Sequence, residues 1–205
     1  MRLLLVRHGD TEFNSSHKFM GHSDIDLSPE GRKQIEYLRD YLADEKIEAV
    51  YASDLLRTIT TAQILTDGRR LVVTPCPELR EMNYGLCEGL TFGEINQNYP
   101  EVAAQCINFT TALEFPEGET FQDFAQRTIS FLDRLKARKP ADTALVVSHN
   151  GPLKTLVCHF LGIDQEHWWQ IRVDTASLSI VDISPRGAML SRLNDVSYLK
   201  KPGKN

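Results

Sequence analysis

Two histidines stand in matching positions, each after an apolar run, and both could take part in chemistry. His8 follows residues 3–6 and one polar residue, and His149 follows residues 143–147 and one polar residue. The carboxyl ends of parallel strands meet at one edge of a sheet, where ligands bind. If the two runs are neighbouring strands, both imidazoles lie at that edge. A single such histidine would ordinarily end a strand and face solvent, but the matched pair favours a shared site.

Residues 7–14 carry a more specific signal. They are Arg-His-Gly-Asp-Thr-Glu-Phe-Asn and resemble the R-H-G-x-T-x-x-N signature of the histidine phosphatase superfamily, which includes the phosphoglycerate mutases. Five fixed residues at set spacing arise by chance in on the order of one chain in ten thousand, given average residue usage. The resemblance implies hydrolysis of phosphate monoesters through a phosphohistidine on His8.

Further segments resemble the family pattern, in the same order, along almost the whole chain. They are residues 21–31, 53–57 with 61–62, 79–89, 116–119 and 147–149. The resemblance places three cations, Arg7, Arg57 and His149, around the transferred phosphoryl group. Arginine suits this task because its planar fork of donors matches two phosphate oxygens at a time.

The proposed nucleophile must be neutral to attack. Neighbouring cations lower the pKa of a histidine, so Arg7 and Arg57 are expected both to bind the phosphate and to keep His8 deprotonated. Glu81 occupies the acid position of the family. Beside a phosphate dianion its pKa is expected to rise, so that it can protonate the leaving alkoxide and later activate water.

Residues that bind the substrate are also implied by the motif. Asn14 and the backbone near Gly21 are expected to complete the phosphate cradle. Asn150 stands where the family usually has glycine, and we expect it to alter substrate contacts. His17 and His22 lie in a polar loop near the site, and the sequence leaves their role open.

No spacing in the sequence is typical of a metal centre. The four cysteines form no CxxC pair, and the other histidines lack HExxH spacing. We therefore expect no metal and no cofactor. The cysteines are expected to serve packing or to lie incidentally at the surface.

The elements that position these residues follow from hydrophobic periodicity. Strand-like runs occupy residues 3–6, 48–51, 71–74, 143–147, 177–183 and 188–193. One helix is expected from the cap Ser28 and Pro29, a second from Thr120 to Leu135, and a third after His149 as far as Gly162.

This alternation predicts an α/β fold with three layers, αβα, and a mostly parallel central sheet. The short segment 184–187 predicts an antiparallel hairpin at one edge. The resemblance implies the same phosphoglycerate mutase-like fold. We expect a single domain over residues 1–205, with a small helical excursion at about 79–116.

Bulk properties limit the partners. A net charge of −5 without a basic stripe argues against a general nucleic-acid binder. The first apolar run is too short for a signal peptide or a membrane span, so we expect a cytoplasmic protein without a membrane partner. The expected partner is a small phosphate ester. The sequence leaves the oligomeric state open, a homodimer included.

Two other functions need to be weighed. A phosphoglycerate mutase must hold two phosphates and a carboxylate, but residues 79–116 offer only Arg80 as a cation, which favours hydrolysis. A phosphate-binding module whose catalysis has decayed should have lost His8, Arg57, Glu81 or His149, and all four are present. The chain length and residues 193–199 look similar to α-ribazole phosphatases and their broad-specificity relatives, which suggests α-ribazole 5′-phosphate as a substrate.

Overall fold

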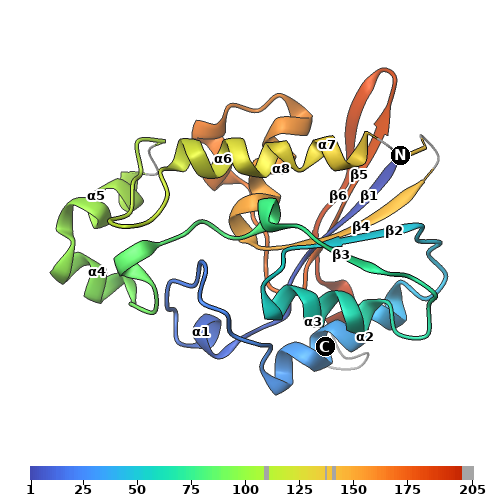
Figure 1. The fold of residues 1–205 in the computed structure, drawn as a ribbon, viewed down its shortest axis with the longest axis horizontal. Helices are drawn as coiled ribbons and strands as arrows, with labels where there is room; N and C mark the ends of the chain where they lie inside the picture. Colours follow the sequence, from blue (N-terminus) through green and yellow to red (C-terminus); the bar gives the residue numbers. More distant parts are fainter. Residues whose placement is uncertain (109–110, 137, 140–141, 200–205) are drawn as a thin grey trace.

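The apolar runs of the sequence form one six-stranded sheet in a computed structural model that describes residues 1–108, 111–136, 138–139 and 142–199. The strand order is β3-β2-β4-β1-β5-β6 (Figure 1). The strands are β1 (Arg2–Arg7), β2 (Ala49–Ala52), β3 (Val73–Pro75), β4 (Thr143–Ser148), β5 (Leu178–Ser184) and β6 (Gly187–Asp195). β1 to β4 are mutually parallel, whereas β5 is antiparallel to both β1 and β6. The expected mostly parallel sheet with an antiparallel edge is confirmed.

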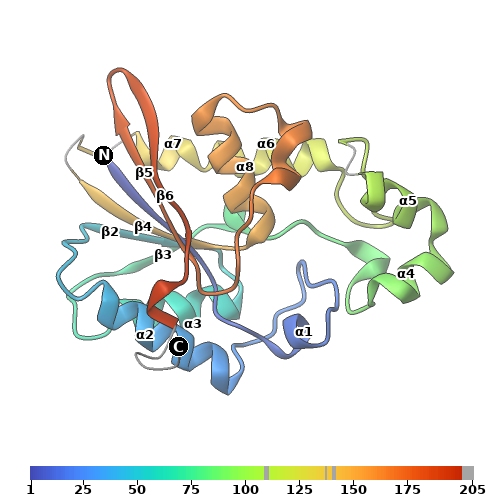
Figure 2. The ribbon, with the colours of Figure 1, turned by 180° about the vertical axis from the view of Figure 1, so that it is seen from behind.

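Helices cover both faces of the sheet and complete the three layers (Figures 1 and 2). One layer contains α2 (Pro29–Tyr41) and α3 (Leu56–Leu65), and the other contains α6 (Phe121–Ser130), α7 (Leu132–Leu135) and α8 (Asn150–Leu161). Successive strand residues point to opposite faces. Leu4 and Val6 therefore pack with α2 and α3, while Leu3 and Leu5 pack with α7 and α8. Burial on both sides explains why this strand is apolar throughout.

The segment of the expected excursion contains short helices that extend away from the sheet (Figure 1). The short helix η1 (Pro77–Leu79) precedes them, and its Leu79 packs with α7 and α8 against the sheet. The extending helices are η2 (Gly85–Cys87), α4 (Phe92–Asn98) and α5 (Pro100–Asn108). They share an apolar cluster with α6, built around Ile95, Val102, Phe115 and Phe124. The remaining helices are α1 (Glu12–Ser15), η3 (Gln165–Gln170) and η4 (Ser197–Leu199).

The expected helix starts are confirmed, and one expected helix is interrupted. The Ser28 hydroxyl accepts a hydrogen bond from Gly31 N at 3.0 Å, and Gly162 ends α8 with φ +64°. The helix expected from Thr120 to Leu135 is divided at Phe131. The Phe131 N–H bonds to the carbonyl three residues earlier, a tighter turn than the α-helix, while its ring packs on Tyr51. The third expected strand also begins later, at Val73, where pairing with Val50 begins, and the preceding Val72 is 84% exposed.

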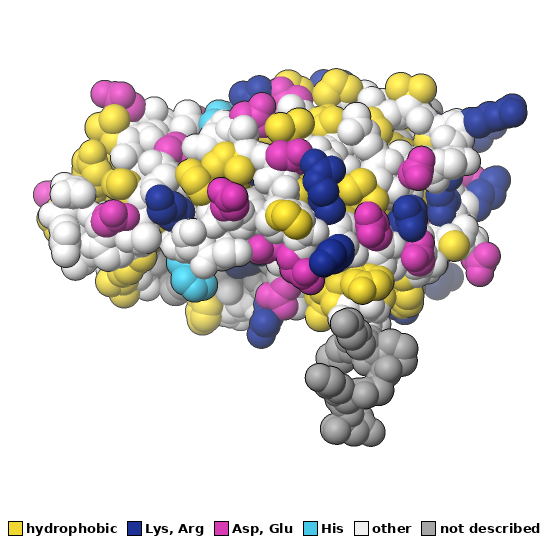
Figure 3. Space-filling model, turned by 90° about the horizontal axis from the view of Figure 1, so that it is seen from below, with side chains coloured by type: hydrophobic (Ala, Val, Ile, Leu, Met, Phe, Trp, Pro, Cys, Tyr) yellow, Lys and Arg dark blue, Asp and Glu magenta, His cyan; other side chains and the backbone are white. Residues whose placement is uncertain are grey.

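The surface carries charges of both signs. On the face shown in Figure 3, Lys and Arg side chains are interspersed with Asp and Glu. Among the residues that the structure describes, no helix is long and apolar enough to cross a membrane.

Candidate active site

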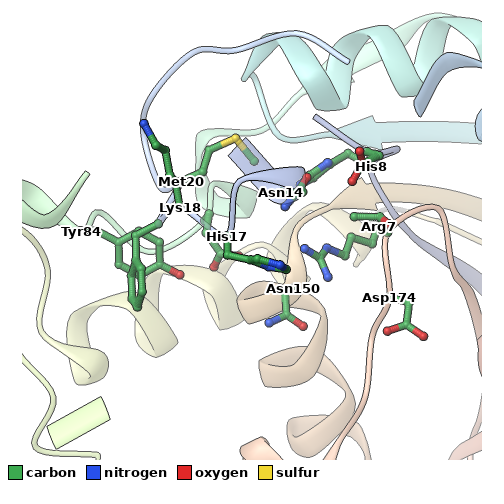
Figure 4. Close-up of a pocket in the computed structure, with 13 residues that line it drawn as sticks. Arg7, His8, Asn14, His17, Lys18, Met20, Tyr84, Asn150 and Asp174 are labelled. Atoms are coloured by element: carbon green, nitrogen blue, oxygen red, sulfur yellow. The ribbon is translucent and has the colours of Figure 1, made fainter. Parts of the chain in front are cut away.

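The two histidines meet at the carboxyl ends of adjacent strands, as the sequence predicts. β1 and β4 pair in parallel with Arg7 opposite Ser148, and the His8 and His149 ring centroids are 5.1 Å apart. A cavity of about 650 Å³ opens here. Its lining includes Arg7, His8, Asp10, Asn14, His17, Lys18, Phe19, Met20, Glu81, Tyr84, Asn150, Asp174 and Thr175 (Figure 4).

The backbone around His8 fixes the protonated nitrogen of its ring. Nδ1 lies 2.7 Å from the Gly9 carbonyl oxygen. A carbonyl can only accept, so Nδ1 carries the hydrogen and Nε2 keeps a lone pair. The adjacent glycine is required by close packing, since a Cβ on Gly9 would lie 2.5 Å from the Gly31 carbonyl oxygen. The arrangement therefore offers Nε2 as a nucleophile.

His8 is held in its neutral form. Its side chain is buried, and this burial, followed by Arg57 and Arg7, lowers its pKa well below the usual 6.5. The expected effect of the arginines is present, but burial is the larger cause. A neutral imidazole keeps its lone pair at neutral pH, as nucleophilic attack requires.

Arg57 is fully buried and holds three partners. Its Nη1 and Nη2 donate to the carbonyl oxygens of Ser23 and Gly21, each at 2.7 Å, and its Nε donates to His149 Nδ1 at 3.2 Å. Burial lowers its pKa to about 10, so it remains a cation at neutral pH. The side chain is thus pre-oriented beside the two imidazoles.

The loop that holds Arg57 is itself held by Glu88. The backbone N–H groups of Gly21, His22 and Ser23 donate to this carboxylate at 3.0, 2.8 and 3.3 Å. We expect the backbone near Gly21 to be part of the phosphate cradle, and this stays a prediction; in the structure the Gly21 N–H donates to Glu88, and Gly21 is not among the described residues that line the cavity. A Cβ at Gly21 would lie 2.0 Å from the Met82 carbonyl oxygen, so glycine is required for this packing.

His149 differs from the expectation that it is a cation. Its Nδ1 accepts from Arg57, so Nε2 carries the hydrogen and donates to Ser53 Oγ at 2.9 Å. Burial, then Arg57 and His8, lower its pKa well below 6.5. The imidazole is therefore neutral, because burial and the adjacent Arg57 guanidinium both disfavour its charged form.

Glu81 also lines the cavity. Its two carboxyl oxygens accept from Met82 N at 3.0 Å and from Gly151 N, near the start of α8, at 3.1 Å. Its side chain is buried, and this burial raises its pKa above the usual 4.5 against the opposing effect of these hydrogen bonds. A Cβ at Gly151 would lie 2.3 Å from Glu81 Oε1. The group is thus suited to keep a proton and then release it.

Some of the other residues expected near the site line the cavity, and one does not. Asn14 Oδ1 accepts from Thr11 N and Oγ1 at 3.2 and 2.9 Å, and Asn14 shares the cavity with Asn150 and His17 (Figure 4). His22 is not among the described residues that line it. In the described part of the chain, no three or more His, Cys, Asp or Glu side chains are grouped to hold a metal ion.

Arg127 on α6 binds the backbone around Glu81, a contact that the sequence does not predict. Its Nη1 donates to the carbonyl oxygens of Glu78 and Arg80, both at 3.0 Å, and its Nη2 to that of Glu81 at 3.3 Å. Glu119 holds the same guanidinium through Nε at 2.8 Å and Nη2 at 2.7 Å. Residues 116–119 resemble the family pattern, but no matched segment contains Arg127, so nothing in the sequence connected it to the site.

Replacing Arg127 with methionine is expected to lower kcat/KM for alkyl phosphates by about 10- to 100-fold, because displacement of Glu81 by an ångström is enough to cost this much. Esters with good leaving groups should be less affected. Arg134→Met is the matched control, since Arg134 contacts only the side chain of Glu78 among these groups, at 2.8 Å. Equal losses in both variants, or an equal loss for both kinds of ester, would refute this positioning role.

The two buried imidazoles should make stability depend on pH. Their pKa values lie below 6.5 in the folded chain, so the unfolded chain binds more protons below that pH. The free energy of unfolding should therefore fall as the pH drops through 6.5, by up to about 1.4 kcal/mol per pH unit for each imidazole. Glu81, with its raised pKa, acts in the opposite sense.

Urea unfolding between pH 7.5 and 5.5 measures this slope. His8→Gln and His149→Asn should each flatten it. A wild-type slope in both active-site variants would contradict the assignment of neutral imidazoles.

Known proteins resemble this chain in sequence and in structure over nearly their full length. Phosphoserine phosphatase 1 of Hydrogenobacter thermophilus is 31% identical over 199 residues, which cover 97% of this chain and 94% of that protein. The adenosylcobalamin/alpha-ribazole phosphatase of Escherichia coli is 35% identical over 195 residues, covering 95% and 96%. The crystal structure of the alpha-ribazole phosphatase from Shigella flexneri matches with a TM-score of 0.90 at 34% identity, covering 96% of this chain and 97% of that one. Residues 3–196 match the family model of the histidine phosphatase superfamily (branch 1), and the chain therefore belongs to this superfamily.

Proposed function

We propose that the chain hydrolyses small phosphate monoesters through a covalent phosphohistidine on Nε2 of His8. The observation that carries this proposal is the buried, neutral imidazole of His8, whose Nδ1–H is bound to the Gly9 carbonyl and whose Nε2 forms no hydrogen bond with the residues that the structure describes. The membership in the histidine phosphatase superfamily and the named activities of the relatives support hydrolysis of this class of ester.

In the first step, Nε2 of His8 attacks phosphorus and the bond from phosphorus to the ester oxygen breaks. Arg7, Arg57 and the Asn14 amide stabilise the charge on the phosphoryl oxygens. Glu81 gives its proton to the leaving oxygen, and the alcohol departs. His149 lies beside the phosphoryl group, and the arriving dianion raises its pKa, so that it can then supply positive charge.

In the second step, a water molecule attacks the phosphohistidine. The Glu81 carboxylate, now deprotonated, takes a proton from this water, and the bond between phosphorus and Nε2 breaks. Inorganic phosphate leaves, His8 is again neutral, and Glu81 is again protonated. The cycle needs only water as a second substrate.

Hydrolysis is favoured over the mutase reaction by the state of Arg80. Its guanidinium forms a bidentate ion pair with Asp54 at 2.7 and 2.6 Å, and it is not among the described residues that line the cavity. This cation is therefore not free to hold a second phosphate. Among small esters, α-ribazole 5′-phosphate and phosphoserine are the first to test, since relatives are named for activity on them.

The setting of the enzyme is part of the same proposal. We place it in the cytoplasm as a single domain over residues 1–205, without a nucleic-acid partner. The net charge of −5 and the interspersed surface charges in Figure 3 support the last point. A homodimer is the assembly to test first, by light scattering.

Hydrolysis of p-nitrophenyl phosphate in the presence of EDTA tests the proposal. We expect the rate to be unchanged by the chelator, because no step passes through a metal ion. A metal-dependent hydrolase would lose activity in EDTA, and a phosphate-binding module would release no p-nitrophenolate under any condition. Either result would contradict the proposed mechanism.

A further inference from the structure

A second cavity of about 160 Å³ lies beside the active-site cavity. The two share three lining residues, Phe19, Glu81 and Tyr84. The rest of this side cavity is formed by Met82, Cys106, Leu113, Phe115, Phe124, Gly151 and Trp168. Because Glu81 lies on the common wall, a group in the side cavity would be next to the proposed proton donor.

The lining of the side cavity is aromatic and uncharged apart from Glu81. Phe19, Tyr84 and Phe115 form a cluster in which neighbouring ring centroids are 4.9 and 5.1 Å apart. Burial raises the pKa of Tyr84 well above its usual value and that of Cys106 to about 11, so both groups are neutral at neutral pH. The surface offered to a ligand is therefore apolar and largely aromatic.

The side cavity is larger than the voids that packing normally leaves in a protein interior. Protein interiors contain few voids bigger than a water molecule. An apolar cavity of about 150 Å³ stays dry and binds benzene, which makes a single aromatic ring the matching occupant. A substrate carboxylate would lose its hydration here without a cationic partner among the described lining residues.

We propose that the side cavity binds an aromatic ring carried by the alcohol part of the substrate, so that the preferred substrates are phosphate esters of small aryl-bearing alcohols. The proposal rests on the proposed function, because the ring is placed while the phosphate lies at His8 and the ester oxygen faces Glu81. Charged substituents of an alcohol stay in the larger polar cavity, near Lys18 and Asp174.

Alkyl esters of equal leaving-group character separate ring binding from leaving-group reactivity. We expect kcat/KM for 2-phenylethyl phosphate to exceed that for ethyl phosphate by about tenfold or more, since filling an apolar pocket by even one methylene changes it by about 10- to 200-fold. Burial of the ring should change both KM and kcat only if Glu81 stays aligned with the ester oxygen. Both constants are therefore measured.

Substitutions at Leu113 change the size of the side cavity in both directions. Leu113→Phe should lower the ratio of the two kcat/KM values about tenfold, and Leu113→Ala should shift preference towards 2-(1-naphthyl)ethyl phosphate. Ile107→Phe is the matched control, because Ile107 is 60% exposed on the nearby helix α5 and does not line the side cavity. Circular dichroism and thermal unfolding verify that each variant is folded.

The outcomes distinguish this inference from the function on which it rests. Equal kcat/KM for the two esters in the wild type, with normal hydrolysis of both, would overturn ring binding and leave the phosphatase intact. A preference that neither Leu113 variant alters would overturn the placement of the ring in the side cavity. Failure of the wild type to hydrolyse any ester would instead overturn the proposed function.

Discussion

Replacement of His8 with alanine is expected to reduce kcat for p-nitrophenyl phosphate by about 10⁴-fold or more, the scale seen when an enzyme loses its nucleophile. The methyl group cannot form the phosphoryl–nitrogen bond, and water would have to attack the ester directly. Rapid quench of the wild type with ³²P-labelled substrate should trap an acid-labile, base-stable phosphoenzyme, and the variant should trap none.

Binding of phosphate should partly survive in the same variant. Arg57 keeps its bonds to the carbonyl oxygens of Ser23 and Gly21 whether or not the imidazole is present. Inorganic phosphate should therefore still raise the thermal unfolding temperature, by an amount set by its remaining affinity. His159→Ala is the control, because it removes a histidine on α8 that is not among the described residues lining the cavity. A near-normal rate in His8→Ala would refute covalent catalysis through this residue.

The fold and the paired histidines were predictable because local patterns determine them. Apolar runs without alternation predict strands covered on both faces, and residues 3–6 and 143–147 form such strands in β1 and β4. Parallel pairing of neighbours then brings His8 and His149 together. The start of α2 was equally local, since the Ser28 hydroxyl and Gly31 N–H that cap it are three residues apart.

The supports of the site depend on contacts between distant segments, which periodicity does not reveal. Glu88 binds Gly21 N across 67 residues, and Arg127 binds the Glu81 carbonyl across 46. The sequence identifies neither of these partners. The protonation of His149 was also beyond sequence reasoning, because it depends on burial and on a hydrogen bond from Arg57.

Replacement of Glu81 with glutamine should slow esters in proportion to how poorly their alcohols leave. An alkoxide departs slowly without a proton, so kcat/KM for ethyl phosphate should fall by about 10²- to 10⁴-fold, the usual contribution of a general acid. p-Nitrophenolate is stable without a proton, and kcat/KM for its ester should fall far less. This constant reports steps up to formation of the phosphoenzyme, so it isolates the acid role from the later base role.

The base role of Glu81 predicts a separate signature in the same variant. Phosphorylation by p-nitrophenyl phosphate stays fast while attack by water slows, so p-nitrophenolate should appear in a burst of about one equivalent per active site before a slow steady state. The substitution keeps the side-chain length, and its amide oxygen can still accept from Met82 N or Gly151 N. Equal slowing of both esters without a burst would mean that Glu81 only shapes the site. Suppose that kcat/KM falls mainly for the ester with the poor leaving group and that p-nitrophenyl phosphate gives the burst. One carboxyl group must then give up a proton in the first step and take one in the second. The raised pKa of Glu81 and its place between the start of α8 and the cavity suit it to both steps.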